Sequence, residues 1–139
     1  MDKELIQIAY MALGGILFAL GGTTDKVWRR YFLPVVTLLY LTVNQVAFWK
    51  AVVSAILLGL VLSLGYGKKK PWGYRILVAL SYSLPSMIIG LSLWQIILPV
   101  CFIVLFKASN TAKIQNEFTW KTVEFITGVL LSISFIGAL

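Results

Sequence analysis

The sequence contains no histidine and a single cysteine, Cys101, among its 139 residues. The absence of histidine excludes a Ser-His-Asp triad and an imidazole metal site, and one cysteine forms neither an intramolecular disulfide nor a thiolate metal cage. The glycine pairs Gly14-Gly15 and Gly21-Gly22 do not match the phosphate-binding loop pattern. We therefore expect a protein that is not an enzyme and that holds no metal or cofactor.

Charged residues are also scarce. They make up 12% of the chain, against roughly a quarter in soluble proteins, whereas hydrophobic residues make up 60%. Long apolar runs alternate with short cationic segments, a pattern typical of integral membrane proteins. The length predicts one transmembrane domain over residues 1–139. The predicted location is the cell membrane, specifically a bacterial inner membrane.

The formal net charge is +7, because 12 Lys and Arg outweigh 5 Asp and Glu. On a soluble protein this imbalance would suggest nucleic-acid binding. Here the cations flank apolar runs, where the positive-inside rule explains them. We expect membrane lipids as partners, anionic ones among them, and no nucleic acid.

Four apolar runs predict one helix each: Leu5–Gly22, Tyr31–Phe48, Ala51–Gly65 and Thr122–Leu139. Polar residues at Asn44, Gln45 and Lys50 predict the turn between the second and third helices.

A fifth block, Ile76–Phe106, contains no charged residue and fits either one long tilted helix or two short ones. Pro85 and Pro99 favour two helices, because proline interrupts the helical hydrogen-bond ladder, and Gly90-Leu91-Ser92 resembles a tight turn. With two helices, most of the cations fall on one side of the membrane, namely Lys26, Arg29, Arg30, Lys68, Lys69, Lys70, Arg75, Lys107, Lys113 and Lys121.

The expected fold is therefore an all-α, polytopic transmembrane bundle of six short spans, with both termini on the non-cytoplasmic side. In the alternative, one helix of the ambiguous block is a re-entrant segment, which leaves five full spans.

Small residues recur every four positions at Ala51, Ala55, Gly59 and Ser63. This spacing places them on one helix face, where they permit close approach of a second helix. We interpret this ridge as a packing surface within the bundle or between copies of the chain, and we expect a homo-oligomer. The alternative is the lining of a narrow pore.

Three neutral polar residues, Gln95, Asn44 and Gln45, are the candidate pore or solute contacts. The alternatives are that Gln95 joins neighbouring helices through hydrogen bonds and that Asn44 and Gln45 end a helix. No charged residue falls near the middle of a predicted span, unlike the pattern in proton-coupled carriers or voltage sensors. This pattern favours passive transport.

The segment around Lys68, Lys69, Lys70, Trp72 and Arg75 combines cations with an aromatic side chain. Such a segment beside an apolar run is a candidate contact for anionic lipid headgroups. The alternative is that these cations only set the orientation of the chain in the membrane.

The residues Gly21-Gly22, Lys26, Trp28-Arg29-Arg30 and Pro34 resemble a pattern in small uncharacterised polytopic membrane proteins of bacteria and their phages. The resemblance implies no activity and no binding residue. The function predicted from the sequence is a channel or passive small-solute transporter. The alternative is a membrane-embedded interaction protein, such as a phage-encoded exclusion factor or a holin-like lesion former.

Overall fold

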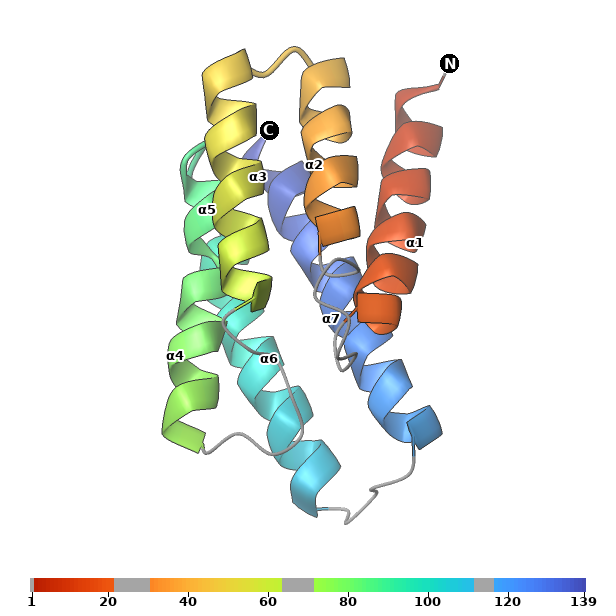
Figure 1. Cartoon of the computed structure of the whole chain (residues 1–139), viewed down its shortest axis with the longest axis vertical. Helices are drawn as coiled ribbons and strands as arrows, with labels where there is room; N and C mark the ends of the chain where they lie inside the picture. Colours follow the sequence, from red (N-terminus) through yellow and green to blue (C-terminus); the bar gives the residue numbers. More distant parts are fainter. Residues whose placement is uncertain (1, 22–30, 64–71, 112–116) are drawn as a thin grey trace.

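The computed structural model describes residues 2–21, 31–63, 72–111 and 117–139, and within them the regular secondary structure is helical. The helices are α1 (Lys3–Gly21), α2 (Phe32–Val43), α3 (Phe48–Ser63), α4 (Trp72–Tyr82), α5 (Leu84–Met87), α6 (Trp94–Thr111) and α7 (Glu117–Ala138). The prediction of an all-α protein is confirmed. Figure 1 shows that the chain runs up and down, so both termini lie at the same end as the α2–α3 turn.

The ambiguous block forms two passes. The chain ascends through α4 and α5, leaves the helical conformation between residues 88 and 93, and returns as α6, which packs along α4. The predicted turn at Gly90-Leu91-Ser92 is confirmed. A Cβ atom on Gly90 would lie 2.7 Å from the Ala138 carbonyl oxygen, so this crossing needs a residue without a side chain.

The two prolines in this block act differently from each other. Pro99 lies inside α6, so the prediction that it breaks the helix is wrong. Pro85 lies in the first turn of α5, and the helix is interrupted just before it, at Ser83 between α4 and α5. The chain then reverses at the residues around Gly90.

The predicted boundary between the second and third helices is also wrong. α2 ends at Val43 rather than Phe48, and α3 begins at Phe48, so Trp49 and Lys50 belong to its first turn. The Gln45 N–H donates to the Thr42 carbonyl and the Val46 N–H to the Leu41 carbonyl, each at 3.1 Å. These two bonds are the Schellman pattern that ends a helix.

The extensive contact of α1 with α7 depends on paired glycines. A Cβ atom on Gly128 would collide with the Gly14 carbonyl oxygen and lie 2.6 Å from the Phe18 Cβ. A Cβ atom on Gly14 would collide in turn with the Ser132 hydroxyl. Gly128 and Ser132 are four residues apart, a small-residue spacing that lets two helix backbones approach closely.

The centre of the bundle is filled by aromatic and aliphatic side chains. The Tyr82 ring packs edge-on against Phe102, with centroids 4.8 Å apart, and against Phe18 at 6.3 Å. Leu98 and Phe135 are buried beside them. These side chains belong to the hydrophobic core of the bundle.

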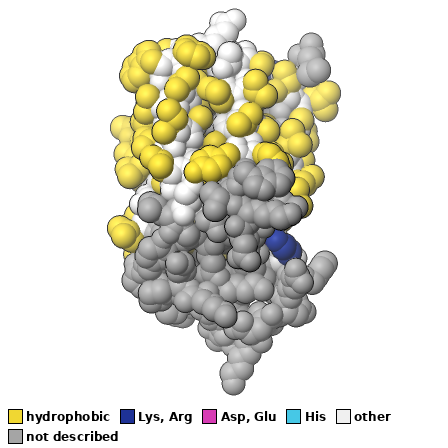
Figure 2. All heavy atoms as spheres, viewed as in Figure 1, with side chains coloured by type: hydrophobic (Ala, Val, Ile, Leu, Met, Phe, Trp, Pro, Cys, Tyr) yellow, Lys and Arg dark blue, Asp and Glu magenta, His cyan; other side chains and the backbone are white. Residues whose placement is uncertain are grey.

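Among the described residues, two stretches of helix are long and apolar enough to cross a membrane: Lys3–Leu20 of α1 and Lys121–Ala138 of α7. The helices Phe32–Val43 and Phe48–Ser63 and the stretch Trp94–Leu105 are apolar but shorter. The described side chains on the face in Figure 2 are mainly hydrophobic. Both findings are consistent with a membrane location.

Candidate functional site

A pocket of about 380 Å³ opens at the end of the bundle that carries the termini. Its lining comes from the start of α1, with Lys3 and Ile6, and from the end of α2, with Val43, Asn44 and Gln45. The structure thus brings Asn44 and Gln45, two of the three candidate solute contacts, together in one pocket. Their role in solute binding stays a prediction.

The end of α2 gives the pocket its shape. The Asn44 side-chain amide donates to the Tyr40 carbonyl at 2.9 Å, which holds Asn44 against the last turn of the helix. Gln45 adopts the left-handed conformation, with φ of 62°. Asn44 and Gln45 therefore end the helix, as the alternative interpretation expected, and also line the pocket.

Hydrogen-bonding side chains continue from the pocket into the bundle between α1 and α2. The Tyr10 hydroxyl and the Thr37 Oγ1 lie 2.7 Å apart, and both side chains are buried. The Tyr10 and Tyr40 rings are in contact, with centroids 4.1 Å apart. The Tyr40 hydroxyl is buried and lies near the side chains of Gln7 and Asn44.

Helix α7 contributes one more buried polar side chain to this region between α1 and α2. The Ser132 hydroxyl is buried, 3.1 Å from the Gly128 carbonyl oxygen and 3.5 Å from the Tyr10 carbonyl oxygen. Together these polar side chains form a row that leads from the pocket into the bundle, and we call this row the polar seam. Its members are the half-buried Gln7 and the buried Tyr10, Thr37, Tyr40 and Ser132.

Sequence analysis did not identify the seam. The Thr37 hydroxyl pairs with Tyr10 of a different helix, so the pair forms only through the packing of α1 on α2. The sequence feature that indicates the seam is the spacing of polar residues along α1 and α2. Lys3, Gln7 and Tyr10 share one face of α1, and Thr37, Tyr40 and Asn44 share one face of α2, since residues three, four and seven apart lie together on a helix.

Gln95 belongs to a different polar cluster, between α5, α6 and α7. Its Nε2 donates to the Ser86 hydroxyl at 3.2 Å and to the Gly90 carbonyl at 3.0 Å, and its Oε1 accepts from the Ser92 N–H. The Ser86 hydroxyl is also 2.8 Å from the Ser134 hydroxyl. These bonds join three elements, and Gln95 does not line the pocket with Asn44 and Gln45.

The small-residue ridge of α3 packs against the start of α2. Ala51, Ala55 and Gly59 are buried. A Cβ atom on Gly59 would lie 3.1 Å from the ring of Tyr31, and the Ser63 hydroxyl is 2.9 Å from the Tyr31 hydroxyl. The ridge therefore makes contacts within one chain, while association between copies stays a prediction.

The candidate lipid contact is only partly visible. Lys68, Lys69 and Lys70 lie outside the described residues. Trp72 and Arg75 lie in α4, but their side chains are not among those described. The contact with anionic lipid therefore stays a prediction.

Two charged side chains meet beside the end of α1. The Glu124 side chain is fully buried, and its carboxylate lies 3.5 Å from the Lys121 ammonium. Lys121 also donates to the Ala19 carbonyl at 2.6 Å, a favourable position because the C-terminal end of a helix is negative. In the described part of the chain, no three His, Cys, Asp or Glu side chains are grouped to hold a metal ion.

Comparison with known proteins found no matching family model, no matching curated protein and no matching solved structure.

Proposed function

We propose that this chain is an integral membrane protein that lets small polar solutes cross the bilayer passively, entering through the pocket and following the polar seam. One observation carries the proposal. A row of hydrogen-bonding side chains runs inward from an open pocket, between helices whose outer faces are apolar. Buried polar groups are costly in a membrane protein, so such a row suggests a path for polar molecules.

In this proposal the bundle crosses the membrane six times, with the termini and the pocket on the non-cytoplasmic side. The up-and-down course of the chain and the apolar exposed surface support this placement (Figures 1 and 2). The 12 residues of α2 span ~18 Å, less than the ~30 Å of a bilayer core. The proposal therefore requires the bilayer to thin locally around α2.

The chemistry of the pocket favours small neutral solutes. The amides of Asn44 and Gln45 offer donors and acceptors, and Lys3 is the charged residue among those lining the pocket. An ammonium group repels cations. Molecules such as glycerol and urea, which both donate and accept hydrogen bonds, match the pocket and the hydroxyl groups of the seam.

The described structure corresponds to a closed path. The Tyr10–Thr37 hydrogen bond and the contact between the Tyr10 and Tyr40 rings occupy the seam. Separating these groups costs about 1 kcal/mol for the hydrogen bond and about 1 kcal/mol for the ring contact. Opening at this cost is compatible with slow passive flux.

Shrinkage and swelling of proteoliposomes test the proposal, with glycerol and urea as probes. Thr37→Val keeps the side-chain shape but removes the hydroxyl whose hydrogen bond to Tyr10 closes the seam. Removing about 1 kcal/mol from the cost of opening should raise the flux roughly fivefold. Thr42→Val is the matched control, because the Thr42 side chain is exposed and bonds to the Leu38 carbonyl of its own helix.

Wild-type flux with a higher rate in Thr37→Val than in Thr42→Val supports the proposal. Equal rates in the two variants would place the path elsewhere. No flux of either probe would favour the membrane-embedded interaction protein. Release of a large trapped dye would favour its holin-like form.

A further inference from the structure

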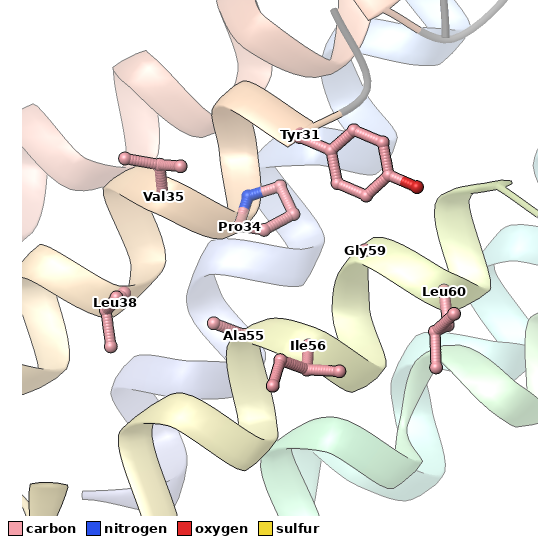
Figure 3. Close-up of a pocket in the computed structure, with 8 residues that line it drawn as sticks. All are labelled: Tyr31, Pro34, Val35, Leu38, Ala55, Ile56, Gly59 and Leu60. Atoms are coloured by element: carbon pink, nitrogen blue, oxygen red, sulfur yellow. The ribbon is translucent and has the colours of Figure 1, made fainter. Parts of the chain in front are cut away.

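A groove lies between α2 and α3 on the outer wall of the bundle (Figure 3). Its volume is about 260 Å³, and its sides are formed by Pro34, Val35, Ile56 and Leu60 among others. Val35, Ile56 and Leu60 are each more than half exposed, at 54%, 57% and 53%. The groove is thus open to the surroundings of the bundle and almost entirely apolar.

One end of the groove is polar. The Tyr31 ring lies over Gly59, and its hydroxyl is 2.9 Å from the Ser63 hydroxyl, which also donates to the Gly59 carbonyl at 2.9 Å. Figure 3 shows the Tyr31 hydroxyl directed toward α3 at this end. Tyrosine is enriched at the membrane–water interface, where one side of the ring is apolar and its hydroxyl is wet.

The sequence next to this polar end is cationic. Arg29 and Arg30 directly precede Tyr31, and Lys68–Lys70 follow Ser63 within seven residues. Residues 22–30 contain three cations against one acidic residue, Asp25, and residues 64–75 contain no acidic residue. A ligand with an apolar chain for the groove and an anionic group for its polar end is complementary to both features.

We propose that the groove binds one acyl chain of an anionic phospholipid, with the phosphate at the Tyr31–Ser63 end. The groove extends from Tyr31 to Leu38, seven residues or ~10 Å along α2. A second copy is a poorer occupant, because this chain has a net charge of +7 and would bring like charge to the cationic end of the groove. The inference rests on the proposed membrane location but not on solute flux.

Native mass spectrometry of detergent-purified protein tests the inference. The probes are phosphatidylglycerol and phosphatidylcholine with identical acyl chains. Val35→Trp fills the groove from an exposed position, so it should reduce retained phosphatidylglycerol at least fivefold. Leu39→Trp is the matched control, one helical turn away, exposed and outside the groove lining. Ile56→Trp repeats the test from α3 if Val35→Trp does not fold.

The headgroup is tested separately. Arg29→Gln with Arg30→Gln should abolish the preference for phosphatidylglycerol over phosphatidylcholine while both lipids remain bound. Equal lipid retention in Val35→Trp and Leu39→Trp would overturn the inference. Conversion of a wild-type dimer to a monomer by Val35→Trp would also overturn it, because a second copy would then be the occupant. Neither readout depends on glycerol or urea flux, so the two proposals fail separately.

Discussion

At the scale of single residues, the pocket is formed by a helix end with an unusual residue. Gln45 occupies the left-handed position that glycine or asparagine normally fills at the end of a helix. Residues with a Cβ atom are less stable there by about 1 kcal/mol. Gln45 also lines the pocket beside Asn44. A role of its side chain in the pocket would explain why glutamine occupies a position whose backbone conformation is unfavourable for it.

Replacing Gln45 by glycine should therefore stabilise the fold. We expect Gln45→Gly to raise the free energy of unfolding by about 0.5–1 kcal/mol, because relief of strain exceeds the added freedom of the unfolded chain. Thermal unfolding in detergent measures the change. Gln45→Val is the companion variant and should be less stable than wild type, since β-branched residues rarely adopt positive φ. Lower stability in Gln45→Gly would show that the glutamine side chain contributes more than the strain costs.

At the scale of helices, neighbouring helices pack through different groups. α1 and α7 approach through backbone atoms at Gly14 and Gly128, whereas α2 and α3 meet through Gly59 beneath the Tyr31 ring. Sequence analysis placed its small-residue ridge on α3. The approach of α1 and α7, which are far apart in the chain, brings Gly128 close to the Gly14 backbone.

The α1–α7 contact should be sensitive to a single methyl group. We expect Gly128→Ala to lower the free energy of unfolding by about 1–3 kcal/mol, because the added Cβ meets the Gly14 carbonyl oxygen, which the helix holds in place. Unfolding in a denaturing detergent provides the measurement. Ala9→Leu is the control: it adds more volume on the exposed face of α1 and should change stability little. Similar losses in both variants would mean that the α1–α7 contact is looser than described.

At the scale of the whole molecule, the two ends differ. The end with both termini carries the pocket, Lys3 and Lys50, which are the two cations outside the predicted cytoplasmic set. At the other end of the bundle α3 ends and α4 begins, and the sequence between them contains Lys68, Lys69 and Lys70. If the bundle crosses the membrane six times, solutes enter the pocket from the side with fewer cations.

Cysteine accessibility tests this orientation in a Cys101→Ala background. We expect Lys50→Cys to react with an impermeant thiol reagent added outside the cell, and Lys69→Cys to react only after the membrane is permeabilised. Thr111→Cys should behave like Lys69→Cys, because α6 returns to that side. Labelling of Thr111→Cys with the external set would contradict six crossings and would indicate that the Ile76–Phe106 block crosses only once.

Much of the architecture was predictable because helix formation and membrane partition depend on local composition. Apolar runs predicted the helices, and the charge pattern favoured two helices in the Ile76–Phe106 block. The boundary near Asn44 was misplaced because apolar residues continue through the turn. There, two backbone hydrogen bonds and the conformation of Gln45 end the helix, and neither is encoded by hydrophobicity.

The sequence by itself determined that this is an all-α chain with apolar helices and separated cations, since those properties follow from residue type and spacing. Only the tertiary structure decided which polar residues meet. Tyr10 and Thr37 pair across 27 positions, and Ser132 joins them from α7, whereas Gln95 bonds elsewhere. The reason is physical: a buried hydroxyl takes the partner that helix packing brings within about 3 Å, and packing depends on the complementary shapes of distant helices.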